Sequence, residues 1–240
     1  MTYDYIFEFL RKNLAGKKAV IGLSGGIDSS LVSAFLAKSI PVDDIIPVFM
    51  PERGTPERDY NDVRKLCEKF KLNLIQVNIE PVIENYMKIL PDAPAGVRGN
   101  LKSRTRMTIL YYYANLHGGL VVGTTNLTEY ITGYYTKFGD GGCDLEPIIN
   151  LTKTEVRTAA KAMGIPESII TKPPTAGLWE GQTDEAEMGL TYDDIDKSID
   201  YFRSNGKFGN DDVSLKVRSM YERNAHKREM PLSPGEEKVR

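Results

Sequence analysis

The chain has 240 residues, a length that fits one large domain. Hydrophobic residues make up 41% of it and charged residues 27%, as in an ordinary soluble protein, and a formal net charge of -2 excludes a global basic field that would attract nucleic acid. No apolar run has the length of a membrane span, and the start of the chain lacks the pattern of a signal peptide. Because the two cysteines, Cys67 and Cys143, form no pairing motif, we expect a reduced, cytoplasmic protein.

Strands and helices are predicted to alternate over roughly the first 125 residues. Apolar runs predict strands at 18–23, 45–50, 72–79 and 120–123, and helical spacing of apolar residues predicts helices at about 6–16, 27–39, 57–70, 82–90 and 100–117. This alternation is typical of a doubly wound parallel α/β sheet with right-handed crossovers. Pro47 cannot donate to a sheet ladder, so we expect the second strand to start near it or to lie at an edge.

The pattern changes after Gly133. A glycine-rich loop is predicted at 139–142, helices at 153–163, 192–202 and 211–224, and a rigid proline-containing loop at 172–177. The acidic segment 178–189 is predicted to be a mobile lid that orders when substrates bind, with a plain surface loop as the alternative.

The first predicted strand leads into Ser24-Gly25-Gly26-Ile27-Asp28-Ser29, which opens a predicted helix. The N-terminus of a helix binds phosphate through its unpaired N–H groups, and paired glycines let the backbone approach an anion closely. Asp28 is negative, so it suits a phosphate site only if a divalent cation lies between the two. The spacing matches neither a P-loop nor a dinucleotide-binding fingerprint. An ordinary turn containing two glycines is the alternative interpretation.

Further motifs follow this loop along the chain. They are Gly99-Asn100 with 102–107, Gly123-Thr124-Thr125-Asn126, Gly133-Tyr134-Tyr135-Thr136-Lys137, Pro147, 151–157, Pro174-Thr175-Ala176 and His226-Lys227-Arg228. The glycine loop resembles the pyrophosphate loop of the ATP pyrophosphatases, and the whole set resembles the ammonia-dependent, single-domain NAD synthetases. The resemblance implies one Rossmann-like domain over residues 1–240, of the adenine nucleotide alpha hydrolase-like fold.

The resemblance also implies an activity. Enzymes of this family join ammonia to deamido-NAD, giving NAD, AMP and pyrophosphate through an adenylated carboxylate, which makes them C–N ligases. ATP is then a co-substrate, Mg²⁺ the cofactor and a homodimer the assembly, with no nucleic-acid or membrane partner. Because the synthetase motifs occupy most of the sequence, we expect the chain to use free ammonia and not glutamine.

The site residues are carried over from the family onto matching positions. The ATP contacts implied are Gly22, Leu23, Ser24, Gly25, Gly26, Ile27, Asp28, Ser29, Thr124, Lys153 and Thr175. The implied magnesium ligands are Asp28 and Glu129, and the implied deamido-NAD contacts are Arg104, Lys137, Asp144, His226 and Lys227. Asp28, Lys137, Asp144 and Lys153 are the predicted catalytic residues, with Asp144 also a candidate for selecting ammonia.

Several of the charged residues have a simpler interpretation. Lys102, Arg104 and Arg106 could form the solvated face of a helix, Lys153 could be a surface charge, and Glu129 could cap a helix. Three other functions compete. A tRNA-thiolating enzyme of the same superfamily needs paired cysteines that this chain lacks, and a GMP-synthetase-like amination fits the 133–137 motif less well. A nucleotide-binding module without catalysis would not need the acidic and basic residues around the phosphates.

Overall fold

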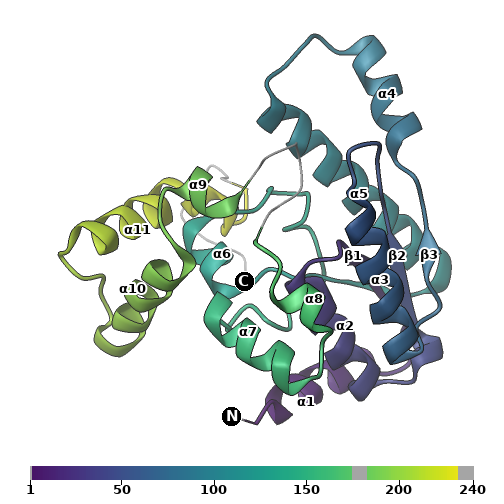
Figure 1. The fold of residues 1–240 in the computed structure, drawn as a ribbon, viewed down its shortest axis with the longest axis horizontal. Helices are drawn as coiled ribbons and strands as arrows, with labels where there is room; N and C mark the ends of the chain where they lie inside the picture. The colour runs from purple at the N-terminus through teal and green to yellow at the C-terminus, as the bar shows by residue number, and fades with distance from the viewer. Residues whose placement is uncertain (1, 175–182, 232–240) are drawn as a thin grey trace.

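A parallel β-sheet forms the centre of the computed structural model, which describes residues 2–174 and 183–231 (Figure 1). The strands described are β1 (Ala19–Leu23), β2 (Ile45–Phe49), β3 (Ile75–Gln76) and β4 (Leu120–Val122). They lie in the order β3-β2-β1-β4, so the chain steps outward in one direction from β1 to β3 and then returns to place β4 on the other side of β1. This reversal creates a topological switch point between β1 and β4, where doubly wound proteins bind ligands.

Helices cover both faces of the sheet. Successive residues of β1 point to opposite faces, and Ala19 and Ile21 join one buried apolar cluster while Val20 joins another. The first cluster is closed by α1 (Asp4–Asn13), α2 (Ile27–Ser39), α3 (Glu57–Phe70), α7 (Lys153–Ala162) and α8 (Glu167–Ile170). The second is closed by α4 (Glu80–Ile89) and α5 (Ala95–His117). Together these layers confirm the predicted doubly wound α/β fold.

A separate group of helices lies to one side of the sheet (Figure 1). It consists of α6 (Leu127–Thr132), α9 (Asp184–Met188), α10 (Tyr192–Asn205) and α11 (Asp212–Arg223). These helices bury their own apolar cluster, with Tyr192, Ile195 and Val217 inaccessible to solvent or nearly so. The carboxyl ends of β1 and β4 and residues Asp184 and Glu187 of α9 line the same cavity, so the two hydrophobic units meet at the switch point.

Several predicted boundaries are confirmed and others are wrong. Helices α2 and α3 have the predicted boundaries, but the predicted strand 72–79 shortens to Ile75–Gln76 because only two of its residues pair with β2. The expectation that Pro47 marks a strand start or an edge is also wrong. Pro47 is the third residue of β2, an interior strand. It is tolerated there because β3 pairs only with the two residues that follow it, so the missing N–H lies outside that ladder.

Several helices differ from the sequence prediction. Helix α5 begins directly after Pro94, five residues before its predicted start, where the residues have no apolar stripe to reveal a helix. The short α6 was not predicted, although a capping box made by Asn126 and Glu129 opens it. The acidic segment 178–189 ends in α9, which buries Met188, while its first part lies outside the described residues. Within the described ranges, no helix is long and apolar enough to cross a membrane.

Candidate active site

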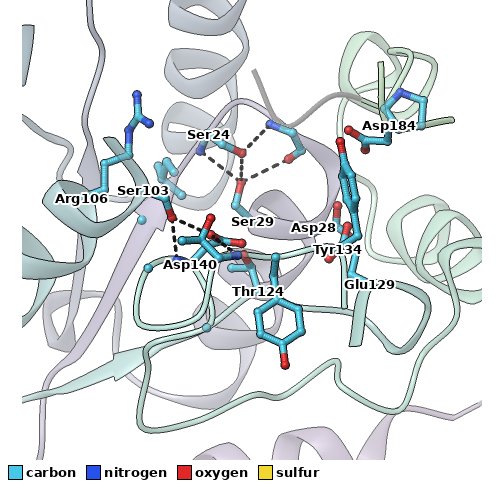
Figure 2. A pocket seen from close by; sticks show the side chains of 18 of the residues that line it. Ser24, Asp28, Ser29, Ser103, Arg106, Thr124, Glu129, Tyr134, Asp140 and Asp184 are labelled. Atoms are coloured by element: carbon cyan, nitrogen blue, oxygen red, sulfur yellow. Dashed lines mark hydrogen bonds between the residues drawn. The ribbon is translucent and has the colours of Figure 1, made fainter. Parts of the chain in front are cut away.

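A cavity of about 720 Å³ opens at the switch point. Its walls include the loop after β1, the loop after β4 and one face of α5 (Figure 2). The side chain of Lys153, at the start of α7, also lines it. Of the predicted ATP contacts, Gly22, Leu23, Ser24, Gly26, Ile27, Asp28, Ser29, Thr124 and Lys153 line this cavity. The structure therefore gathers residues that are more than a hundred positions apart in the sequence around one volume.

The loop after β1 has the geometry of an anion-binding turn. Ser24 and Ser29 place their hydroxyl oxygens 3.1 Å apart, and the Gly26 N–H donates to Ser24 Oγ at 3.1 Å. Gly25 has φ +76, and a Cβ there would lie 3.1 Å from the backbone of Asp59, so both conformation and space favour glycine. The first N–H groups of a helix lack partners within it, and Ile27, Asp28 and Ser29, which open α2, line the cavity, as phosphate binding requires.

An ion cluster lies beside this loop. Lys153 Nζ is 2.6 Å from Asp28 Oδ2 and 3.2 Å from Glu129 Oε1, and its side chain is only 4% exposed. Asn126 joins the cluster by donating from Nδ2 to Asp28 Oδ1 at 2.9 Å. Three elements distant in sequence thus supply two carboxylates and one ammonium. The alternative in which Lys153 is a surface charge is wrong, because the side chain is buried.

The charges in this cluster are unequal. Burial lowers the pKa of Lys153, but the carboxylates of Asp28 and Glu129 outweigh burial and raise that pKa, so the ammonium stays charged. Burial raises the pKa of Glu129, the Lys153 ammonium opposes that rise, and Asp28 adds to it. Two carboxylates against one ammonium leave the cluster net negative when all three are ionised, which is unfavourable beside a phosphate-binding loop.

A magnesium ion fits the chemistry of this cluster. Mg²⁺ prefers oxygen ligands and is usually held by one or two carboxylates together with substrate phosphates. Asp28 and Glu129 both line the cavity and both form ion pairs with Lys153, so their carboxylates are close to one another (Figure 2). Among residues 2–174 and 183–231, no group of three or more His, Cys, Asp or Glu side chains could hold a metal ion alone. The donor set therefore suits an ion shared with a bound nucleotide.

Most of the predicted deamido-NAD contacts lie beside the cavity instead of lining it. Arg104 donates from Nη2 to the Lys137 carbonyl at 3.2 Å, and Lys137 donates from Nζ to the His226 carbonyl, so these three residues form one exposed group. Asp144 accepts from the Val121 N–H at 2.8 Å and from the Tyr111 hydroxyl at 3.2 Å, and it is also exposed.

Lys227 alone of the predicted deamido-NAD contacts lines the cavity. Its ammonium donates to the carbonyls of Gly133 and Tyr135, at 2.6 and 2.7 Å. Gly25 shapes the glycine loop without lining the cavity, and Thr175 lies outside the described residues.

Sequence reasoning missed three polar groups in the cavity wall. Arg106 is largely buried and donates from Nε to the Met50 carbonyl at 3.1 Å, and burial lowers its pKa while Glu52 opposes this. Ser103 donates to Asp140 Oδ1 at 2.5 Å. Lys172 pairs with Asp59 and donates to the Gly25 carbonyl at 3.1 Å, which fixes the glycine loop.

One signal in the sequence could have identified part of this wall. Ser103, Arg106, Met107 and Leu110 recur at helical spacing on the face of α5 that lines the cavity. Of the three basic residues that could have formed a solvated face, Lys102, Arg104 and Arg106, only Arg104 is exposed. Lys102 pairs with Glu52 at 2.7 Å, and Arg106 faces the cavity.

A largely buried carboxylate is hydrogen-bonded to the loop that carries Thr124. Glu146 accepts from the Thr125 N–H and from the Cys143 thiol, both at 3.1 Å. Burial raises the pKa of Glu146 to about 7. Burial also raises the pKa of Cys143, and the nearby Glu146 carboxylate raises it further. Burial likewise raises the pKa of Cys67 to about 11. Neither thiol has the environment of a nucleophile.

Known proteins share this chain's sequence and fold over almost its entire length. A family model described as NAD synthase matches residues 2–231. The NH(3)-dependent NAD(+) synthetase of Thermoplasma acidophilum is 51% identical over 230 residues, covering 96% of this chain and 95% of that protein. Among solved structures, the NMN synthetase of Francisella tularensis is 32% identical with a TM-score of 0.86, covering 98% of this chain and 99% of that one. The NH3-dependent NAD synthetase of Campylobacter jejuni, in complex with the nitrate ion, is 26% identical with a TM-score of 0.83, covering 98% of this chain and all (100%) of that one. On this evidence the chain belongs to the NAD synthase family.

Proposed function

We infer that this chain is an ATP-dependent ligase that amidates deamido-NAD with ammonia, releasing NAD, AMP and pyrophosphate in the last step of NAD biosynthesis. The observation that carries this function is the pairing of an anion-binding loop with the Asp28–Lys153–Glu129 cluster at the switch point. A carboxylate attacks the α-phosphorus of ATP, the bond to pyrophosphate breaks, and ammonia then displaces AMP from the adenylated carboxylate. The main physical demand is to stabilise the charge that develops on pyrophosphate as it leaves.

The residues around the cavity can meet that demand. The N–H groups and hydroxyls of Ser24 to Ser29 would hold the departing phosphates, and the Lys153 ammonium would take up charge from them. Asp28 and Glu129 would hold Mg²⁺, which supplies Lewis-acid stabilisation of the phosphate oxygens. When all three groups are ionised the cluster is net negative, so a divalent cation would reverse its sign and favour the approach of a triphosphate.

The second substrate would occupy the rest of the site. Arg104, Lys137 and His226 lie together, and we assign them with Lys227 to deamido-NAD, whose phosphates and carboxylate suit cationic partners. Asp144, anchored by a backbone N–H, would contact the same substrate and is the candidate that selects ammonia. Thr124 and Thr175 are assigned to ATP.

A homodimer and a cytoplasmic location complete the proposal. Large apolar side chains are exposed on α4 and α5, where Ile89, Val97, Tyr112 and Leu116 are 78%, 57%, 64% and 59% exposed. Such a surface favours association, and a second copy of this chain is the proposed partner. Sedimentation of the purified protein as a monomer at micromolar concentration would contradict it. Both cysteines are free, which agrees with a reducing compartment.

The decisive assay supplies the purified chain with deamido-NAD, ATP, Mg²⁺ and ammonium. We expect NAD, AMP and pyrophosphate in equal amounts, with a rate that rises with pH as ammonium gives up its proton. Glutamine freed of ammonia should not replace ammonium. Sustained NAD formation from glutamine, with matching glutamate release, would refute the expected use of free ammonia.

A parallel reaction tests the acid substrate. Because a close structural relative is named an NMN synthetase, nicotinate mononucleotide should be offered in place of deamido-NAD. A higher kcat/KM for the mononucleotide would reassign the substrate while leaving the chemistry of activation unchanged.

A further inference from the structure

Helix α10 presents two buried polar side chains to the ion cluster. Tyr192 and Asp196 are four residues apart, so they lie on the same face of the helix, and they are 0% and 4% exposed. Neither belongs to the ATP or deamido-NAD contacts assigned above. Both belong to the helical group beside the sheet, which places them at the junction between the two hydrophobic units.

The carboxylate of Asp196 joins the N-termini of two helices. Its Oδ1 accepts from Thr128 Oγ1 at 2.5 Å, and its Oδ2 accepts from the Thr154 N–H at 2.8 Å. Thr128 Oγ1 in turn accepts from the Lys153 N–H at 2.9 Å. Thr128 precedes Glu129 in the first turn of α6, and Thr154 follows Lys153 in the first turn of α7. The Asp196 carboxylate therefore holds the residue before Glu129 and the residue after Lys153, two members of the ion cluster.

Electrostatics favour this arrangement. The first N–H groups of a helix lack partners within it and carry partial positive charge, so an anion at two N-termini is stabilised by both. Thr128 is 0% exposed, Lys153 3% and Asp196 4%, so water cannot easily replace these three partners in the chain of hydrogen bonds. Removing one group would leave others unsatisfied and would let the two helix starts shift relative to each other.

Tyr192 supports the other end of the lysine. Lys153 Nζ lies 5.1 Å from the centroid of the Tyr192 ring, within the range of a cation–π contact. The Tyr192 hydroxyl donates to Asp184 Oδ2 at 2.8 Å, and burial raises the pKa of that hydroxyl, so it remains a donor. The ring thus contacts the ammonium that both carboxylates bind, while the hydroxyl ties α10 to the start of α9.

We propose that Asp196, acting through Thr128, and the ring of Tyr192 are positioning residues that set the Lys153 ammonium and the Glu129 carboxylate for phosphate chemistry. The inference rests on the proposed function of the cluster and adds residues to it. A purely structural role is the alternative, since both side chains also stabilise the junction. The chain offers a matched control for that role in Ser198, a buried residue of α10 that donates to Ser214 Oγ at 3.1 Å within the helical group.

The first test compares Thr128→Val, Thr128→Ser and Ser198→Ala in the full-length enzyme. Melting temperature, the thermal shift produced by ATP with Mg²⁺, kcat and both KM values are measured for each. Thr128→Val should lower kcat by about 10- to 100-fold, because small displacements of reacting groups cost that much, and should leave KM for deamido-NAD unchanged. Thr128→Ser keeps the hydroxyl and should recover most of kcat. Ser198→Ala should lose a similar amount of thermal stability and keep its kcat.

The second test compares Tyr192→Phe with Tyr192→Leu. The phenylalanine keeps the ring beneath Lys153 and should keep kcat within a few-fold, whereas the leucine should lower it at least tenfold. Equal losses in the two variants would overturn the role of the ring. Similar kcat values for Thr128→Val and Ser198→Ala would overturn the role of the Asp196 network. A wild-type protein that shows no thermal shift with ATP and Mg²⁺ and no NAD formation would instead refute the proposed function itself.

Discussion

Replacing Asp28 by asparagine tests the ion cluster most directly. Asn126 cannot rotate to suit the new side chain, because its Oδ1 already accepts from the Glu129 N–H at 3.0 Å and its Nδ2 must face position 28. The carboxylate of Asp28 accepts from both Asn126 and Lys153, whereas an asparagine has a single acceptor oxygen for these two donors. One donor in a largely buried site is therefore left facing an NH₂ group.

The magnitude follows from that count. An unsatisfied buried donor costs about 1–3 kcal/mol, and relief of the repulsion between Asp28 and Glu129 offsets part of it, so we expect a loss of about 1–2 kcal/mol. For a chain of this size that is a fall of roughly 2–8 °C in melting temperature with the fold retained. Loss of a proposed metal ligand at the leaving group should lower the rate of adenylation by about 10²–10³, or about 3–4 kcal/mol of barrier.

The assay is pyrophosphate release from ATP and deamido-NAD at ordinary Mg²⁺, with melting temperature measured on the same samples. Asp44→Asn is the matched control. This variant breaks an ion pair of the same length, 2.6 Å between Lys18 Nζ and Asp44 Oδ1. Asp44 lies just before the N-terminal end of β2, away from the cavity. The control should keep its rate because the pair is on the surface. Near-normal pyrophosphate release by Asp28→Asn would refute the assignment of this carboxylate.

Three further predictions follow from the packing and charges. Lys153→Met leaves two largely buried carboxylates without their ammonium and should cost about 3–5 kcal/mol of unfolding free energy in urea. The double variant Lys153→Met with Glu129→Gln should lose less than the sum of the two single losses, and simple additivity would contradict the coupling. Because burial raises the pKa of Glu146 to about 7, the folded state binds more protons than the unfolded chain between about pH 4.5 and 7. Stability should therefore fall by up to about 3 kcal/mol as pH rises through that window, and Glu146→Gln should remove this dependence; an unchanged pH profile of unfolding in the variant would count against it. Gly133 has φ +68, and Gly133→Ala adds a Cβ atom 2.3 Å from the Cβ of Asn224 at the end of α11. Gly16 has a similar φ of +72 but open space around it, so the melting temperature should fall further in Gly133→Ala than in Gly16→Ala. Equal falls would show that the steric contact is unimportant.

The sequence determined the local elements and their chemistry. The apolar run of β1, the glycines that follow it and the helical spacing of α2 predict a strand, a phosphate-binding turn and a helix because each depends on residues close in the chain. Asp28 was identified in the same way, since a carboxylate in an anion-binding turn implies a cation. The order of the remaining motifs was sufficient to indicate the family.

The tertiary structure alone decided which distant residues act together. Asp28 and Lys153 are separated by 125 residues, and no local pattern indicates that one ammonium is shared between Asp28 and Glu129. The same holds for Arg106, which looks like its exposed neighbour Arg104 until the packing of α5 buries it against the Met50 carbonyl. Asp196 gave no signal in the sequence, because its role depends on two helix N-termini that meet only after the helical group packs beside the sheet. Propensity and spacing act over one or two turns of chain, whereas burial and ion pairing depend on contacts that only the folded chain makes.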